Sequence, residues 1–199
     1  MQSGSSDITQ LVAMVREGIA TFDLFLRVMA VVTSACEAQG LRPIVVGGHA
    51  LAIYTRGDYA TRDIDLVAPD AVGDVLSSLG FTKELGERHW YHDELQVAIE
   101  VPSRDLAGSI ERVVKLNLDS GGHVYVIGVE DLIVDRLRAC VYWKSTVDCE
   151  WAERLFAVHS QDLDLAYISK AIEHEPDYGA PQMRSLVEEW VSRFTGTEP

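Results

Sequence analysis

A chain of 199 residues, 47% hydrophobic and 24% charged, can bury one substantial core but leaves little room for two large independent domains. The formal net charge of −14 at pH 7, from 31 acidic and 17 basic residues, repels phosphate backbones and argues against non-specific nucleic-acid binding. No run approaches the roughly 20 apolar residues that a bilayer-spanning helix needs, and the N-terminus lacks the basic and apolar regions of a signal peptide, so we expect no membrane partner and a cytoplasmic location.

The N-terminal region, residues 1–40, has the periodicity of helices that pack on a core. Apolar residues form a stripe from about Asp7 to Gln39, and Gly40 supplies a helix stop. A break near Thr21 divides this stretch into two predicted helices, with Thr21 or Asp23 available as an N-cap.

The central region, residues 41–128, changes period and predicts an α/β core. A β-branched run ends at Gly47-Gly48 and is followed by a helix, and Gly121-Gly122 is typical of a hairpin turn. The predicted elements are the strand Ile44–Val46, the helix His49–Tyr54, the strand Ile64–Val67, the helix Asp70–Leu79, and the strands Phe81–Leu85, His89–His92, Leu95–Val101, Val113–Leu118 and His123–Ile127.

The C-terminal region, residues 129–199, returns to helical periodicity and predicts an all-helical layer in the same compact unit. The predicted helices begin near Val129 and cover Glu150–His159, Asp162–Glu173 and Pro181–Phe194. The expected fold is therefore α/β (α+β), with a mixed β-sheet flanked by helices, an N-terminal helical pair and a C-terminal helical layer.

The three cysteines are odd in number and lack the CxxC spacing of zinc sites. This pattern indicates reduced thiols with a packing role, as in a reducing compartment. Cys140 and Cys149 could in principle meet across a helical hairpin, but the reducing compartment favours three free thiols, Cys36 included.

Two aspartates carry the clearest chemical signal. Strand alternation puts Asp63 and Asp65 on one face, with their side chains rooted roughly 6.5 to 7 Å apart. Two such carboxylates repel each other unless a cation lies between them, and hard oxygen ligands favour Mg²⁺ or Mn²⁺. The alternative is that Asp63 caps a turn and Asp65 lies on a solvated edge.

The glycine turn Gly47-Gly48 lies 15 residues before Asp63. Between a strand and a helix, exposed backbone N–H groups and the positive helix end can receive a phosphate. A plain tight turn between the two elements is the alternative.

Together, residues 45–52 and 61–66 resemble the nucleotidyltransferase fold of the DNA polymerase β superfamily, over roughly residues 43–101. In that superfamily a strand ends in Gly-Gly or Gly-Ser, and a later strand bears two metal-binding aspartates. The form found here is similar to bacterial minimal nucleotidyltransferases related to abortive-infection toxins.

The resemblance implies a third acid from a neighbouring strand, and alternation in 95–101 favours Glu100. Val97 and Ile99 share the opposite face, and the small Ala98 leaves space beside the acid. The family more often has aspartate here, and the extra methylene of Glu100 changes how a second metal would be held. Asp93, Glu94 and Asp105 are competitors, and an ordinary solvated carboxylate is the alternative.

Several basic residues are candidate nucleotide ligands. His49 stands where the family has a serine or another small residue, so it contacts phosphate or base, caps the helix, or packs beneath the loop. Arg56 and Arg62 flank the loop before the aspartates, where a guanidinium suits triphosphate oxygens or balances local acids.

The resemblance extends these candidates to Arg136 and Lys144, because the related group often has a lysine near the position of Arg136. A solvated basic helix face is the alternative. Asp148 corresponds to an acid in that group, or serves as a helix N-cap.

The segment His89–His92 invites a metal-site interpretation. In a strand, however, residues three apart point to opposite faces, so His89 and His92 should not share an ion. We expect no zinc site from this pair.

The implied function is transfer of a nucleoside monophosphate from a nucleoside triphosphate (NTP) to a hydroxyl acceptor, with Mg²⁺ or Mn²⁺ held by Asp63, Asp65 and Glu100. A small molecule or a protein suits the acidic chain better than tRNA. The rivals are a catalytically silent nucleotide- or partner-binding module, such as a toxin–antitoxin component, and a structural adaptor. If Glu100 does not face the two aspartates, a second metal ion lacks its ligand, and the catalytically silent module becomes the favoured interpretation.

Overall fold

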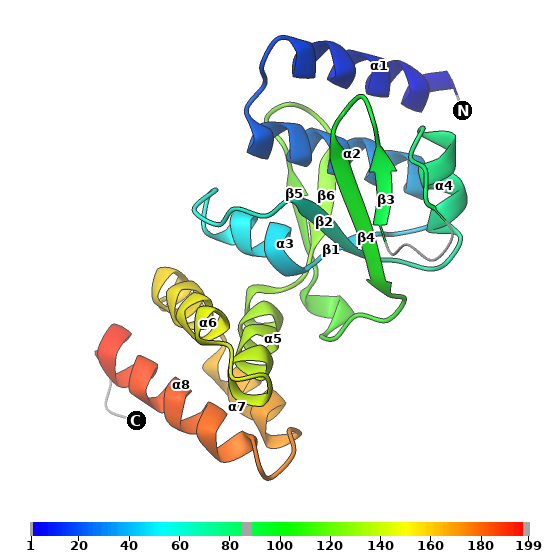
Figure 1. Ribbon diagram of the computed structural model, residues 1–199. Helices are drawn as coiled ribbons and strands as arrows, with labels where there is room; N and C mark the ends of the chain where they lie inside the picture. The colour runs from blue at the N-terminus through cyan, green and yellow to red at the C-terminus, as the bar shows by residue number, and fades with distance from the viewer. Residues whose placement is uncertain (1, 85–88, 197–199) are drawn as a thin grey trace. The chain divides into compact units, whose positions relative to one another are not determined.

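A six-stranded mixed sheet forms the centre of the N-terminal part of the molecule (Figure 1). The computed structural model describes residues 2–84 and 89–196. The chain divides into two compact units, one made of Met1–Leu106 and Ile110–Ile127, and the other of Ala107–Ser109 and Gly128–Pro199.

The sheet of the first unit has the order β3-β4-β2-β1-β6-β5. Two pairs of neighbours are parallel, β2 with β4 and β1 with β6, and the remaining pairs are antiparallel. The strands are β1 (Ile44–Val45), β2 (Asp63–Val67), β3 (His89–His92), β4 (Val97–Ser103), β5 (Val114–Asn117) and β6 (His123–Val126).

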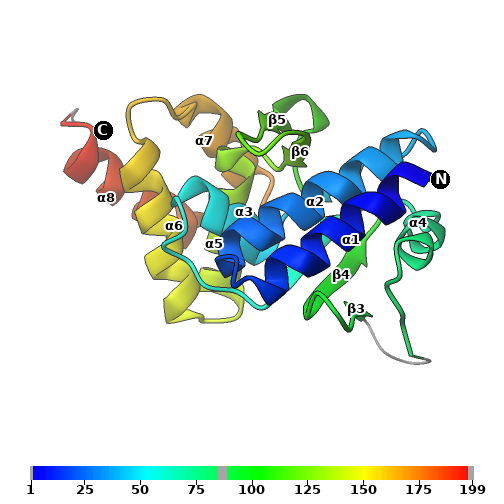
Figure 2. The same ribbon diagram turned by 90° about the horizontal axis from the view of Figure 1, so that it is seen from above.

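Among the described residues of the first unit, four α-helices accompany this sheet. Figures 1 and 2 both show α1 lying alongside α2, and α2 also contacts β6 and α4. The helices are α1 (Gln2–Arg16), α2 (Thr21–Glu37), α3 (Gly47–Tyr54) and α4 (Val72–Ser78), and a short 3₁₀ turn, η1, covers Ile110–Arg112. One face of the central strands is fully buried, through side chains such as Ile64, Leu66, Val97 and Ile99. This core holds β2 and β4 rigidly in place.

The second unit is all-helical. Its first helix, α5, contacts each of the other three. The helices are α5 (Val129–Tyr142), α6 (Thr146–His159), α7 (Leu165–Glu173) and α8 (Ala180–Phe194). They enclose a core that includes Leu132, Phe156, Ile168, Met183 and Trp190. In the described part of the chain, none of the helices combines the length and apolar character needed to cross a membrane.

The expected fold class is confirmed, and so are most elements to within a few residues. The strand predicted at Phe81–Leu85 is wrong: Thr82 forms only an isolated bridge with Tyr91, and Leu85 lies outside the described residues. The N-cap of α2 is Ala20 and carries no side-chain hydrogen bond, so the expected cap at Thr21 or Asp23 is also wrong.

The expectation of three reduced thiols is wrong for one pair. Cys140 in α5 and Cys149 in α6 form a disulfide, with their Cα atoms 4.7 Å apart. The short turn between these helices folds them into a hairpin, and this local geometry prevails over the argument from compartment. Cys36 is a free, buried thiol in α2.

Candidate active site

The register between β2 and β4 brings three carboxylates to one face of the sheet. Asp65 pairs directly with Glu100, and Asp63 pairs with Ala98. Their neighbours Ile64 and Ile99 point into the core and are fully buried, whereas the carboxylate side chains stay accessible, 35% exposed at Asp63 and 16% at Glu100. Since adjacent strands lie about 4.8 Å apart, the acids form one group. The face predicted for Glu100 is therefore correct.

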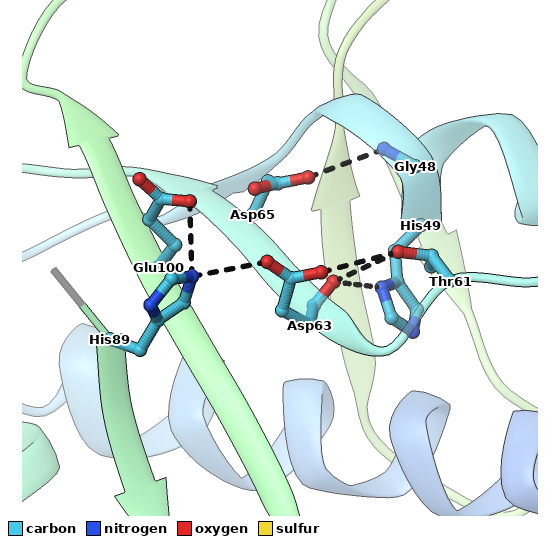
Figure 3. A network of polar contacts seen from close by, with 7 residues as sticks. All are labelled: Gly48, His49, Thr61, Asp63, Asp65, His89 and Glu100. Carbon is cyan, nitrogen blue, oxygen red and sulfur yellow. Dashed lines mark hydrogen bonds and ion pairs between the residues drawn. The ribbon is translucent and has the colours of Figure 1, made fainter.

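The edge strand β3 adds a histidine to this group. His89 is the direct partner of Glu100 in the antiparallel β3–β4 pair. Its Nε2 lies 3.3 Å from Oδ2 of Asp63 and 3.3 Å from Oε2 of Glu100, so it lies between two acids that come from two other strands (Figure 3). His89 is not among the site residues predicted from the sequence.

His92 lies on the other face, as alternation predicts. It is buried against Phe81, with ring centroids 5.2 Å apart, and its Nδ1 lies 3.3 Å from the backbone nitrogen of Leu95. The two histidines therefore lie on opposite faces and cannot share an ion, whereas His89 lies beside Asp63 and Glu100. The short segment between His92 and Val97 could have identified His89 as a site residue. A tight hairpin of four residues there sets His89 opposite Glu100.

The glycine turn lies directly beside Asp65. Gly47 has a φ of +56°, and a Cβ there would come within 2.2 Å of Oδ2 of Asp65. The backbone N–H of Gly48 donates to the same oxygen at 3.3 Å (Figure 3). The positive start of α3 thus faces a carboxylate. Only glycine permits so close an approach in this left-handed conformation.

His49 packs beneath β2. Its side chain is 1% exposed, its ring meets Phe25 edge-on with centroids 4.5 Å apart, and its Nδ1 lies 2.8 Å from the backbone oxygen of Asp63. Burial lowers the pKa of His49 more than the hydrogen bond to Asp63 raises it, so the neutral imidazole donates through Nδ1–H. Of the three roles expected for His49, the observed contacts are those of packing beneath the loop.

Thr61 supports the carboxylate of Asp63 from the loop before β2. Its hydroxyl lies 3.4 Å from the backbone oxygen of Asp63 and 3.5 Å from Oδ1. Arg56 and Arg62 are exposed in the same loop, at positions just after α3 and just before β2. Their contact with a nucleotide remains a prediction.

The other predicted basic ligands belong to the second unit. Arg136 pairs with Asp135 and, at 2.8 Å, with Asp148, while Lys144 is exposed with a φ of +54°. Asp148 is not the N-cap of α6: that residue is Ser145, whose hydroxyl accepts from the Asp148 backbone N–H. The nucleotide-binding role of Arg136 and Lys144 remains a prediction.

The donor set fits a divalent cation. Among the described residues, Asp63, His89 and Glu100 form a cluster whose ligand atoms lie within 4.8 Å of one another. Metal–ligand bonds of about 2.1 Å place adjacent ligand atoms roughly 3.0 to 3.4 Å apart, which matches the two 3.3 Å separations at His89. The competitors Asp93, Glu94 and Asp105 lie outside this cluster.

Known proteins resemble this chain in sequence or in fold. A family model described as "Nucleotidyltransferase of unknown function (DUF6036)" matches residues 23–192. The fold is similar to the crystal structure of an antigenic nucleotidyltransferase-like protein from Paracoccidioides brasiliensis, with a TM-score of 0.54 and 12% identity over 85% of this chain and 88% of that one.

Two structures of the antibiotic-resistance factor ANT(2″)-Ia are more distant in fold. One, in complex with adenylyl-2″-tobramycin, has a TM-score of 0.47 and 15% identity over 82% of this chain and 94% of that one. The other, determined in solution, has a TM-score of 0.46 and 16% identity over 83% and 90%. No curated protein matches the chain.

Proposed function

Because this chain belongs to the family described as "Nucleotidyltransferase of unknown function (DUF6036)", we propose that it transfers a nucleoside monophosphate from an NTP to a hydroxyl acceptor, with divalent metal ions. The membership confirms the resemblance drawn from the glycine turn and the two aspartates. The observation that carries the proposal is the register that sets Glu100 beside Asp65, on the face that Asp63 shares.

Asp63, Asp65 and Glu100 are the residues proposed to hold Mg²⁺ or Mn²⁺. Bound there, the ions would stabilise the attacking and leaving oxygens of an in-line displacement at the α-phosphorus. Contacts already in place support both aspartates: Thr61 lies against the Asp63 carboxylate, His49 bonds to the backbone oxygen of Asp63, and the Gly48 N–H donates to the Asp65 carboxylate. This preorganisation lowers the cost of holding the two aspartates close together.

The transfer step conserves all atoms of the NTP and the acceptor. The acceptor oxygen forms a bond to the α-phosphorus as the bond from that phosphorus to the α–β bridging oxygen breaks. Pyrophosphate leaves with the bonding electron pair, and the acceptor's proton passes to water. Gly47 and Gly48 lie at the start of α3, where backbone N–H groups can hold a phosphate oxygen.

The acceptor proposed is a small hydroxylated molecule or a protein side chain rather than tRNA. The chain carries a net charge of −14, which opposes approach of a polyanion. The silent binding module is the weaker account, because its distinguishing feature, a Glu100 turned away from the aspartates, is absent from the described β2–β4 pair.

Label transfer tests this proposal. The full chain is incubated with Mg²⁺ or Mn²⁺ and each NTP, labelled at either the α- or the γ-phosphate, together with polyhydroxylated antibiotics, acceptor proteins or tRNA. The expected result is stable product label from the α-phosphate alone, with matching pyrophosphate release, and loss of both in Glu100→Gln. Asp74→Asn removes an exposed acid from α4 and should leave transfer unchanged. Label from the γ-phosphate would contradict the proposed reaction.

A further inference from the structure

His89 is the one nitrogen donor in the cluster of three potential metal ligands, and its position is set by the backbone. The β3–β4 pairing runs from His92 with Val97 to His89 with Glu100 without a shift. The turn is closed by a hydrogen bond of 2.9 Å from the Gln96 N–H to the His92 carbonyl. His89 therefore reaches the acids from a fixed register rather than from a mobile loop.

The imidazole is placed to serve two carboxylates at once. Nε2 lies at the same distance, 3.3 Å, from an oxygen of Asp63 and an oxygen of Glu100. A single N–H cannot point straight at both oxygens. A cation among the three atoms would instead bind both carboxylates and the ring nitrogen, and the two 3.3 Å separations at Nε2 are ones that metal coordination spheres show.

The cluster also leaves room for further ligands. The side chain of His89 is 42% exposed and that of Asp63 is 35% exposed, so water or a phosphate oxygen has access. Asp65 lies next to the cluster, between Glu100 and the start of α3 (Figure 3). A three-ligand protein site with open positions is typical of metal centres that bind substrate.

We propose that His89 is a direct nitrogen ligand of the metal ion held by Asp63 and Glu100, and that it makes this site favour Mn²⁺ or Zn²⁺ over Mg²⁺. The proposal rests on the proposed function and deepens it by naming the class of metal. Mg²⁺ prefers oxygen ligands in a near-ideal octahedron, whereas imidazole suits Mn²⁺ weakly and Zn²⁺ strongly. Carboxylates alone would bind Mg²⁺ readily. A histidine ligand therefore shifts the preference of the site toward Mn²⁺ or Zn²⁺.

Pulsed electron paramagnetic resonance of bound Mn²⁺ tests this assignment without any activity. A directly bound imidazole gives a ¹⁴N modulation of the Mn²⁺ echo, which changes when the histidines carry ¹⁵N. The full chain loaded with Mn²⁺ should show this modulation, and His89→Ala and His89→Gln should lose it. Because the side chain of His89 is 42% exposed and lies outside the buried core, neither substitution removes core packing.

His123 offers a matched control. Its Nε2 lies 3.0 Å from Oε1 of Glu37, so it is a second histidine–carboxylate pair, at a position outside the described metal cluster. His123→Ala should keep the ¹⁴N modulation. Modulation that persists in His89→Ala, or Mn²⁺ bound without any modulation, would overturn the proposal.

Calorimetry gives the selectivity. In the wild type, Mn²⁺ and Zn²⁺ should bind more tightly than Mg²⁺, and His89→Ala should weaken both by about tenfold or more while changing Mg²⁺ affinity little. An equal loss of affinity for all three ions in His89→Ala would overturn the claim that His89 sets the metal preference. Nitrogen-ligated Mn²⁺ in a chain that transfers no nucleotide would instead contradict the proposed function and leave the ligand assignment standing.

Discussion

His49 and Asp63 are joined by a hydrogen bond of 2.8 Å that runs from the buried imidazole Nδ1 to the backbone oxygen of the strand residue. The bond ties the first turn of α3 to the first residue of β2. Since the Asp63 carboxylate is proposed to bind metal, the buried His49 helps to set the position of a partly exposed candidate ligand.

His49→Ala should therefore destabilise the fold and weaken metal binding together. It removes a buried hydrogen bond and the edge-on contact with Phe25, for an expected loss of about 2 to 4 kcal/mol in the free energy of unfolding. Urea denaturation gives this free energy and Mn²⁺ titration gives the affinity. His49→Phe, which keeps an aromatic ring without the donor, separates the two contributions. An unchanged free energy of unfolding in His49→Ala would show that the hydrogen bond to Asp63 does not stabilise the fold.

Gly47→Ala should abolish metal binding, whereas Gly40→Ala should not. Both glycines have positive φ, +56° and +71°, so both substitutions carry a backbone strain of roughly 1 kcal/mol. At Gly47 the added Cβ would lie 2.2 Å from Oδ2 of Asp65 and collide with it. At Gly40 the added Cβ would have no other atom within 4 Å. Thermal denaturation and Mn²⁺ titration of the two variants check this difference. Equal metal affinity in both would contradict the close approach of Gly47 and Asp65.

Thiol counting should find one free cysteine, which reacts only after the chain unfolds. Without reductant, the native chain should react with no thiol reagent, because Cys36 is buried and the other two cysteines are bonded. The denatured chain should give one thiol before reduction and three after it. Closing the short loop between Cys140 and Cys149 contributes about 2 to 3 kcal/mol by chain entropy, so reduction should lower stability. Three thiols without reductant would mean that the bond does not form.

Alkaline pH should destabilise the chain partly through Cys36. Burial raises the pKa of its thiol from 9.0 to about 12. The folded state therefore keeps a proton that the unfolded state loses, so this contribution to stability is complete below pH 9 and falls as pH rises toward 12. Unfolding free energies at pH 8, 9 and 10 should fall more steeply in the wild type than in Cys36→Ala, by up to roughly 1 kcal/mol per pH unit above pH 9. Parallel curves would contradict a buried, neutral thiol.

Local patterns were enough to predict the carboxylate face. Alternation in β2 and β4 depends on backbone geometry alone, so the shared face of Asp63 and Asp65 and the outward face of Glu100 followed from the sequence. The glycine turn was also predictable, since Gly47 needs a conformation that other residues disfavour.

Contacts between distant segments were not predictable in the same way. His89 enters the site through strand order, because β3 pairs with β4 while β4 pairs with β2. The burial of His49 depends on Phe25, which comes from a helix that precedes the sheet in the sequence. The Cys140–Cys149 bond depends on how tightly two helices turn, which composition does not reveal.

Metal-dependent NTP binding tests the central claim most directly. Isothermal calorimetry would titrate ATP, CTP, GTP and UTP into the full chain with and without Mn²⁺ or Mg²⁺, for the wild type and for Asp63→Asn/Asp65→Asn. The matched control is Asp74→Asn/Asp119→Asn, which removes the same two charges from exposed positions on α4 and in the β5–β6 turn.

At least one NTP should bind only when metal is present, with binding lost in Asp63→Asn/Asp65→Asn and kept in the control. That result would assign the carboxylates to a nucleotide–metal site and rank the bases. NTP binding that is equally strong without metal, or equally strong in the Asp63→Asn/Asp65→Asn variant, would contradict the account.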